Sequence, residues 1–493
     1  MNTKKNTCHS RENLKKIEAY GVLSTHHRMT IPLQEMPAQD PNERVKNMSE
    51  VSLGYTEEQA LVEANRCFQC KNAPCVQGCP VRINIPGFIN AIAQRDYQNA
   101  INIIKQTSLL PAVCGRVCPQ EEQCQSPCTL GKTLKDKNKA VSIGRLERYA
   151  ADWDRQNHLV KSPVIQAETG KKVAIIGSGP AGITAAADLR RAGHSVTIFE
   201  AFHKPGGVMV YGIPEFRLPK KIVELEIETL KKMGVNIITD FVVGRTRKLL
   251  DLMQKDYFDA IFIGSGAGLP KFMNIEGENC IGVFSANEYL TRLNLMKAYQ
   301  LEKFETPIYH GRKVAVLGGG NVAMDSARTA LRVGAEEVHV IYRRTEAEMP
   351  ARAEEVGHAK EEGVKLHLLQ NIHRILGNDA GYVKAIECLR YELGAPDTTG
   401  RRSPVPIKGS EFTMEVDTVI IAVGNGSNPL IKQSTPDLAV NQNGYIITDT
   451  DGKTSIKGIW AGGDIVLGSA TVILAMGQGR EAARSINEFL AQK

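Results

Sequence analysis

The chain has 493 residues, too many for one ordinary hydrophobic core, so two to four domains are expected. Hydrophobic residues make up 42% and charged residues 23%, which excludes a disordered chain and is typical of soluble globular proteins. The net charge of +7 is small for this length, and Lys and Arg are not gathered into aromatic-interleaved blocks. This pattern argues against nucleic-acid binding and allows weak attraction for a phosphate-rich cofactor or an acidic protein partner.

Residues 1–35 are an N-terminal extension to which the sequence assigns no role. They mix polar and charged residues without the apolar core of a secretory signal, so we expect a cytoplasmic protein. No stretch of the chain approaches the roughly eighteen apolar residues that a membrane span requires, so we expect no membrane association.

Residues 36–150 are predicted to form short helices joined by cysteine-bearing loops, because apolar residues recur at helical spacing and strand signals are scarce. Most of the 11 cysteines lie here, in two quartets. The first quartet is Cys67, Cys70, Cys75 and Cys79, and the second is Cys114, Cys118, Cys124 and Cys128. Such a segment has little core of its own, so we expect bound metal to supply part of its folding energy.

The spacing of the cysteines favours iron–sulfur clusters. In bacterial ferredoxins three closely spaced cysteines hold one cluster, and a fourth, just before a proline, ligates the other cluster. Cys79 precedes Pro80, so we expect its thiol to leave its neighbours and join the downstream group. Zinc is an alternative, because closely spaced cysteine pairs also close tetrahedral sites. Disulfides would suit a small secreted scaffold better than a chain without an export signal.

Residues 165–300 are predicted to be the first part of an FAD-binding domain. An apolar strand leads into Gly177, Gly179 and Gly182, which suit a tight turn, close approach of a pyrophosphate and helix–strand packing. Glu200, at the end of the next strand, can accept hydrogen bonds from ribose hydroxyls. A glycine turn without a ligand is the alternative, but the full strand, turn and helix context favours FAD or NAD(H).

Residues 301–415 repeat the pattern and are predicted to bind NADPH. The small residues of this second turn are Gly318, Gly320 and Ala323. Its second strand ends in Arg343 and Arg344, where the first copy has an acid. A guanidinium binds a 2′-phosphate bidentately, whereas a carboxylate repels it. The alternative is that one or both arginines only solvate the surface.

Residues 416–493 are expected to return and complete the FAD-binding domain. Gly463 and Asp464 follow a strand, and Thr471 and Val472 begin the next helix, so all four are expected at the FAD site. The predicted fold is α/β, with a helical N-terminal iron–sulfur domain followed by two Rossmann-like domains, the second inserted in the first. Two sites of opposite ribose chemistry suit hydride transfer from NADPH to FAD.

The combined motifs resemble the small (beta) subunit family of NADPH-dependent glutamate synthase. Its relatives include the large subunit of NADH-dependent ferredoxin:NADP oxidoreductase and the N-terminal part of dihydropyrimidine dehydrogenase. The similarity covers about residue 36 to the end and includes both quartets, both glycine turns and the segments 36–41, 111–119 and 143–148.

The resemblance implies two 4Fe–4S clusters in the helical domain. One would be held by Cys67, Cys70, Cys75 and Cys128. The other would be held by Cys79, Cys118, Cys124 and Glu147, with Cys114 a neighbour and not a ligand. The alternative for Glu147, from this chain alone, is an ordinary helix-surface carboxylate.

The resemblance also implies a function: electrons pass from NADPH via FAD and the two clusters to a partner. The partner would be a glutamate synthase large subunit, in glutamate biosynthesis and ammonia assimilation, so we expect an oligomer or hetero-complex. A ferredoxin:NADP oxidoreductase or an electron-bifurcating subunit, with a ferredoxin-type acceptor, is the alternative. A non-catalytic redox sensor is a hypothesis of another class. No Cys-x2-Cys pair adjoins either glycine turn, so a thioredoxin reductase reaction has no dithiol to use.

Overall fold

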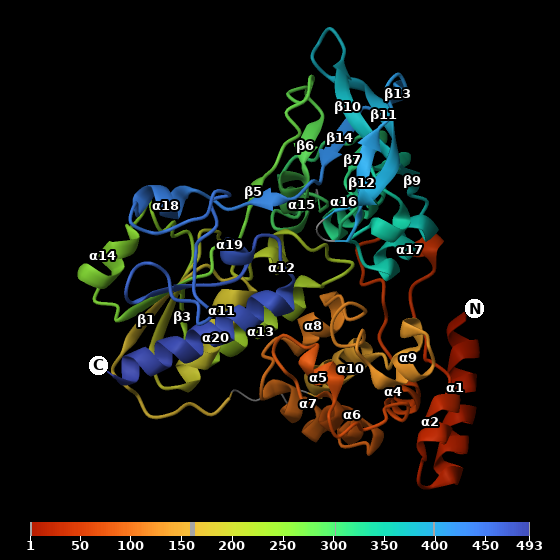
Figure 1. Ribbon diagram of the computed structural model, residues 1–493, viewed down its shortest axis with the longest axis vertical. Coiled ribbons are helices and arrows are strands. Elements are labelled where there is room, and N and C mark those ends of the chain that lie inside the picture. Colours follow the sequence, from red (N-terminus) through yellow and green to blue (C-terminus); the bar gives the residue numbers. More distant parts are fainter. Residues whose placement is uncertain (1, 158–162, 301, 398–399, 493) are drawn as a thin grey trace.

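The computed structural model describes residues 2–157, 163–300, 302–397 and 400–492. Three bodies are visible in Figure 1: a helical N-terminal domain in red and orange, and two sheet domains with helices on their faces. In the part of the chain that the structure describes, no helix combines the length and apolar character that crossing a bilayer would require.

The named elements of the N-terminal domain are all helices over its described residues, as predicted, and one isolated β-bridge joins Ala38 to Ser52. Proline or a capping side chain starts most of these helices; Thr56, for example, exchanges hydrogen bonds with Gln59 in a capping box. The helices are α3 (Pro41–Arg44), α4 (Glu57–Ala64), α5 (Pro74–Gln77), α6 (Ile85–Ala93), α7 (Tyr97–Lys105), α8 (Pro111–Val117), α9 (Thr129–Thr133), the 3₁₀ helix η1 (Lys137–Lys139) and α10 (Ile143–Gln156).

The N-terminal extension is helical too. Helix α1 (Asn2–Tyr20) packs on α4, and α2 (Thr25–Thr30) follows it. Arg28 of α2 donates from Nη1 to the carbonyl oxygens of Asn65 (2.9 Å) and Cys67 (2.8 Å). The extension therefore contacts the backbone of the first predicted cysteine ligand.

The first nucleotide domain is a five-stranded parallel sheet in the order β16-β4-β1-β2-β3. Its strands are β1 (Lys172–Ile176), β2 (Ser195–Phe199), β3 (Asn236–Ile238), β4 (Ala260–Ile263) and β16 (Ile459–Ala461). Its helices are α11 (Pro180–Arg191), α12 (Val208–Tyr211), α13 (Lys220–Lys232), α14 (Leu249–Gln254), α18 (Leu430–Ser434), α19 (Asp464–Leu467) and α20 (Val472–Ala491). Helix α20 lies against α11, so the last segment of the chain does return to this domain (Figure 1).

The second nucleotide domain is also a five-stranded parallel sheet, in the order β6-β14-β7-β8-β9. Its strands are β6 (Val283–Ser285), β7 (Lys313–Leu317), β8 (Glu337–Tyr342), β9 (Lys365–Leu368) and β14 (Thr418–Ile421). Its helices are α15 (Ala286–Asn294), α16 (Asn321–Arg332), the 3₁₀ helix η2 (Glu346–Glu348) and α17 (Ala353–Glu361).

This topology corrects the expected domain limits of 301 and 416. Val419 pairs with both Val283 and Ala315, so the strands at 283–285 and 418–421 belong to the second sheet. Both had been placed in the FAD-binding parts because their short apolar runs do not reveal their hydrogen-bond partners. The crossing back to the first domain follows β14, where β15 (Asn425–Gly426) pairs with β5 (Leu269–Pro270).

An antiparallel extension projects from the second nucleotide domain (Figure 1). Its central strand β11 (Val383–Pro396) pairs with the other three strands. These are β10 (Gln370–Gly377), β12 (Arg402–Pro406) and β13 (Phe412–Glu415).

Buried ion pairs join the second nucleotide domain to the first and to the helical domain. Arg217, in the first nucleotide domain, lies 2.7 Å from a carboxylate oxygen of Asp325 in α16. Arg44 of the helical domain lies 2.7 Å from Glu362, just after α17, and all four side chains are almost fully buried. Breaking such a pair on one side leaves an uncompensated buried charge, which costs about 3–5 kcal/mol. The three bodies are thus fixed to one another.

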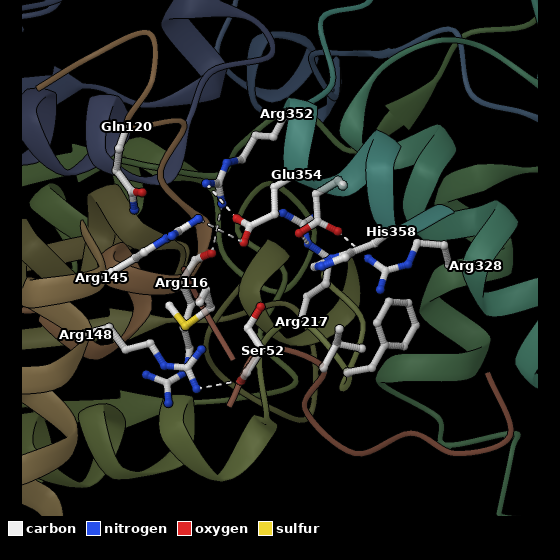
Figure 2. Close-up of a pocket in the computed structure, with 15 residues that line it drawn as sticks. Ser52, Arg116, Gln120, Arg145, Arg148, Arg217, Arg328, Arg352, Glu354 and His358 are labelled. Atoms are coloured by element: carbon white, nitrogen blue, oxygen red, sulfur yellow. Dashed lines mark hydrogen bonds and ion pairs between the residues drawn. The ribbon is translucent and has the colours of Figure 1, made fainter. Parts of the chain in front are cut away.

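A cavity lies where these three bodies meet (Figure 2). Arg352 and Arg145 both reach toward Glu354, at 3.2 and 3.8 Å, and Arg148 donates to the carbonyl oxygen of Ser52 at 2.8 Å. The arginines that line it are Arg116, Arg145, Arg148, Arg217, Arg328 and Arg352. Each of them is also within ion-pair distance of an acid, so the cavity is part of the domain interface and not an open anion site.

Candidate functional site

The two predicted ligand sets surround two separate cavities in the helical domain. The first cavity is lined by the thiols of Cys67, Cys70, Cys75 and Cys128. The second is lined by Cys79, Cys118, Cys124 and the carboxylate of Glu147. Ile85 and Ile143 are in the walls of both. The cavities are therefore neighbours that share a wall.

Cys79 leaves its own quartet, as the spacing predicted. Cys75 lies in helix α5, which ends at Gln77. A tight turn follows, in which Arg82 donates its backbone N–H to the Cys79 carbonyl oxygen at 2.9 Å. Gly78 permits close packing here, because a Cβ at this position would lie 2.7 Å from the carbonyl oxygen of Gln123. The two cysteine loops thus press together, and the Cys79 thiol faces the second cavity.

The chemistry of the second cavity suits a cationic group. The Glu147 side chain is buried, and its Oε1 has no hydrogen-bond partner among the described residues. Burial raises the pKa of Glu147 to about 8 and the pKa of Cys79 to about 11. Anions in such surroundings need a positive partner, which the iron of a cluster would provide. A thiol-lined cavity with an unpaired carboxylate therefore fits an iron–sulfur cluster with one oxygen ligand.

A single metal ion fits the cavities less well. Among the described residues, no group of three or more His, Cys, Asp or Glu side chains closes on one ion, as a tetrahedral zinc site would require. Ten cysteines in the described chain are free thiols. Cys114 lines neither cavity; its buried Sγ lies 3.6 Å from Sδ of Met476 in α20, so it packs as a neighbour.

The first glycine turn has the geometry of a dinucleotide site. Gly177 adopts a φ of +95°, and a Cβ on Gly182 would lie 2.0 Å from the Gly177 carbonyl oxygen. Gly179 faces open space at the N-terminus of α11, where backbone N–H groups can meet a pyrophosphate. Gly177 thus makes the tight turn, Gly179 leaves room for a pyrophosphate, and Gly182 allows the helix to pack closely on the turn.

Glu200 is buried at the end of β2, beside this turn. Its Oε2 accepts from the Ser178 backbone N–H at 3.0 Å and from the Ser178 hydroxyl, while Oε1 accepts from the Phe202 N–H at 2.8 Å. The carboxylate therefore also braces the glycine turn. A carboxylate has about four lone-pair positions, so it retains capacity for a ribose hydroxyl.

The last segment adds a second acid to the same region. Gly463 has a φ of +81° and starts α19, and burial raises the pKa of Asp464 to about 6. Tyr211, on α12, interacts electrostatically with both Asp464 and Glu200, and its pKa is raised to about 12, mainly by burial. The sequence analysis missed Tyr211, because α12 is one short turn without a motif.

Helix α20 links the flavin region to the second cavity. Thr471 caps the helix by accepting from the Leu474 N–H, and it also accepts from the Gln123 side chain at 3.2 Å. Gln123 lines the second cavity, and so does Ile473, two residues further along the helix. Thr471 and Val472 therefore adjoin the helical domain as well as the predicted FAD site.

The second glycine turn is looser at one point. Gly318 has a φ of +143°, and Gly320 starts α16 with only Pro350 within 4 Å of where a Cβ would lie. Ala323 occupies the third position and is fully buried, so this helix leaves room for a methyl group. The N-terminus of α16 is open to a phosphate in the same way as that of α11.

The two arginines after β8 have different surroundings. Arg343 is exposed, and its guanidinium makes no hydrogen bond or ion pair within the described ranges. Arg344 is buried; its Nε donates to the Arg402 carbonyl oxygen at 2.7 Å, and its Nη2 lies 3.1 Å from Asp397. Arg343 is thus the freer group for a 2′-phosphate, and Arg344 also holds the antiparallel extension.

Comparison with known proteins now identifies the family. Residues 44–159 match the dihydropyrimidine dehydrogenase domain II family, which carries a 4Fe–4S cluster, and residues 171–479 match the pyridine nucleotide-disulphide oxidoreductase family. The glutamate synthase (NADPH) small chain of Azospirillum brasilense is 35% identical, over 93% of this chain and 95% of that one. The chain belongs to this family of small chains. It is an NADPH-dependent oxidoreductase with flavin and iron–sulfur modules.

The similar proteins include a second glutamate synthase small chain and one protein of a different name. The glutamate synthase (NADPH) small chain of Escherichia coli K12 is 37% identical, over 88% of this chain and 92% of that one. The beta subunit of an NADP⁺-dependent formate dehydrogenase from Moorella thermoacetica is 40% identical, over 85% of this chain. This chain spans only 60% of the Moorella subunit's length.

Solved structures share the fold of the nucleotide domains. Mycobacterium tuberculosis FprA in complex with NADPH has a TM-score of 0.55 and 19% identity, covering 65% of this chain and 85% of that one. Lactococcus lactis thioredoxin reductase has a TM-score of 0.50 and 22% identity, covering 66% of this chain and 100% of that one. These likenesses confirm the paired α/β domains of the family.

Proposed function

We propose that this chain is the electron-input subunit of a glutamate synthase, located in the cytoplasm. It would take hydride from NADPH and deliver electrons to a larger partner subunit, in glutamate biosynthesis and ammonia assimilation. Support comes from the glutamate synthase small chains, whose similarity to this chain extends over 95% and 92% of their own lengths.

The residues proposed to hold the cofactors fall into four sets. The first 4Fe–4S cluster would be held by Cys67, Cys70, Cys75 and Cys128. The second would be held by Cys79, Cys118, Cys124 and Glu147. FAD would bind at Gly177, Gly179, Gly182, Glu200, Gly463, Asp464, Thr471 and Val472. NADPH would bind at Gly318, Gly320, Ala323, Arg343 and Arg344.

One observation carries the proposal: the candidate sites adjoin one another in series. The first cavity shares Ile85 and Ile143 with the second, and the second is walled by Ile473 of α20. The first turn of that helix lies beside the predicted FAD site, because a Cβ on Gly463 would lie 3.6 Å from Cβ of Ala475 in α20 and 3.0 Å from Cβ of Ala181 in α11. Electron transfer between bound groups requires that neighbouring sites stay close together at constant distances.

The chain's own residues bind and orient, and the bound groups supply the redox chemistry. FAD, when bound, supplies hydride acceptance, and the clusters supply single-electron transfer. Glu200 holds the glycine turn rigid through Ser178, and Arg217 with Asp325 fixes the second nucleotide domain against the first. Both contacts keep the two nucleotide sites in a constant relation.

The test uses the full chain, prepared anaerobically with flavin and iron–sulfur content measured. NADPH oxidation is followed with a small dye, with ferredoxin, and with a glutamate synthase large subunit plus glutamine and 2-oxoglutarate. We expect dye reduction by the chain alone, and glutamate formation only when the large subunit is present. Transfer to ferredoxin without any glutamate formation would refute the glutamate synthase assignment.

A second candidate is an electron-transfer subunit for a different acceptor, such as a ferredoxin-type partner. It is favoured by the 40% identity to the Moorella formate dehydrogenase beta subunit. The same assay distinguishes the two functions, because this candidate requires NADPH-linked ferredoxin turnover that is independent of glutamine.

A further inference from the structure

A lysine-rich surface covers one side of the first cysteine cavity. The segment 129–143 starts and ends in the cavity wall, because Thr129, Leu130, Val141 and Ile143 all line the cavity. The exposed lysines of the intervening stretch are Lys132, Lys135, Lys137 and Lys139, and Lys71, also exposed, follows Cys70 directly. We call these five residues the lysine rim.

The lysine rim carries little compensating charge. Asp136 is the acid within the segment, and its Oδ2 lies 3.9 Å from Nζ of Lys139. Lys71, Lys132, Lys135 and Lys137 have no ion pair in the part of the chain that the structure describes. The arginines at the domain interface are, by contrast, paired with acids. The positive charge of the rim is therefore available to a partner.

The first cavity has more of its cysteines at the surface. Two of its four, Cys70 and Cys75, are partly exposed, against one of three at the second cavity, where Ile473 of α20 forms part of the wall. Helix α9, which carries Lys132, lies on the side of the helical domain away from α20 (Figure 1). The rim thus adjoins the first cavity, at the end of the series of sites away from α20.

We propose that the lysine rim is the docking surface for an acidic electron-acceptor protein or subunit. This inference rests on the proposed electron-delivery function and adds the charge of the partner and the place where it binds. Opposite charge steers a partner to the cavity's open side and orients it there, which raises the association rate more than the final affinity.

The composition of the rim favours a protein over a membrane or a nucleic acid. Helix α9 has five residues and η1 has three, too short to lie in a bilayer surface as an amphipathic helix. The rim consists of lysines without arginine, and stacking platforms for single-stranded nucleic acid use aromatic and arginine side chains. Membrane or nucleic-acid binding is left as an outcome of the test.

The test compares two charge-reversed variants of the full, cofactor-loaded chain. The rim variant carries Lys132→Glu, Lys135→Glu, Lys137→Glu and Lys139→Glu. The control carries Lys221→Glu, Lys384→Glu, Lys408→Glu and Lys457→Glu, which change four exposed lysines on the nucleotide domains. The probe is an acidic plant-type 2Fe–2S ferredoxin, with its dissociation constant measured by calorimetry at several salt concentrations.

We expect the rim variant to bind ferredoxin about tenfold more weakly at low salt and to lose most of the salt dependence, while the control keeps both. NADPH-driven dye reduction should be equal in all three proteins. Equal weakening in the control, or no weakening in the rim variant, would overturn the inference. So would rim-dependent binding to phosphatidylglycerol vesicles or single-stranded DNA that is tighter than binding to ferredoxin. Failure of the wild type to reduce the dye would instead refute the proposed function, since binding is measured separately.

Discussion

Each nucleotide domain has a five-stranded parallel sheet, but the two sheets take one outer strand from opposite ends of their part of the chain. The edge strand of the first sheet is β16, the last strand in sequence, whereas the edge strand of the second sheet is β6, which precedes the rest of its sheet. Both domains turn on glycines, yet the first requires Gly182 where the second accommodates Ala323. The first site carries Glu200 after its second strand, and the second site carries arginines. The difference between Gly182 and Ala323 therefore reflects helix packing, and the difference between Glu200 and the arginines reflects the charge of the ligand.

Substitution of Gly182 should give the largest effect, because it tests the packing difference. In Gly182→Ala the new methyl group would lie 2.0 Å from the Gly177 carbonyl oxygen, so backbone must move. We expect the free energy of unfolding to fall by about 3 kcal/mol or more and bound flavin to be lost. Denaturant unfolding and flavin absorbance measure both. Normal flavin content and stability would mean that the two turns are equally tolerant.

Reversing the charge of Arg343 tests the ligand-charge difference. Its guanidinium has no hydrogen-bond or ion-pair partner in the described chain, so Arg343→Glu should mainly weaken binding of the NADPH 2′-phosphate. We expect kcat/KM for NADPH to fall by about a hundredfold, as loss of a charge-assisted hydrogen bond and added repulsion imply. The value for NADH should change little, and Lys384→Glu on the same domain serves as the control. An equal fall for NADH would place the effect outside phosphate recognition.

The acid after the edge strand of the first sheet, Asp464, makes the stability of that domain depend on pH. Burial raises the pKa of Asp464 to about 6, above its ordinary value of 3.8. The native state then holds the proton more tightly than the unfolded state, so this group's contribution to stability falls as pH rises from about 4 to 6. Asp464→Asn should remove that fall, worth about 1–3 kcal/mol.

Urea unfolding of wild type and Asp464→Asn at pH 4, 5, 6 and 7 checks this prediction. The variant's advantage should grow across the series and level off above pH 6. A constant difference between the two proteins would show that Asp464 does not titrate in this range.

The smallest effect is expected from Ala323→Gly, the converse of the first substitution. It adds backbone freedom in α16 and removes one buried methyl group, so stability should fall by about 1 kcal/mol. The KM for NADPH and the flavin content should stay unchanged. A large rise in KM would mean that the Ala323 methyl group positions the phosphate-binding turn.

Local motifs were predictable from the sequence, and long-range pairings were not. The glycine turns could be predicted at Gly177, Gly182 and Gly318, because the backbone geometry that each turn requires depends only on neighbouring residues. The departure of Cys79 from its quartet followed from its spacing and the proline after it. Each of these inferences uses residues within one short segment.

The features that sequence could not supply depend on contacts between distant segments. Strands at 283–285 and 418–421 are too short to indicate which sheet they join, so the domain limits were wrong. The contact between Gln123 and Thr471 joins residues that are far apart in the chain, and neither belongs to a motif. Arg28 lies in an extension whose polar sequence gave no sign that it contacts the Cys67 backbone.

Because Ile473 forms part of the wall of the second cavity, the two cavities are completed at different times during synthesis on the ribosome. The lining of the first cavity is complete once residue 143 has been made, but the second waits for residue 473. At usual translation speeds the delay is on the order of tens of seconds. Throughout that interval the nascent helical domain presents Cys79, Cys118 and Cys124 without the wall that Ile473 supplies.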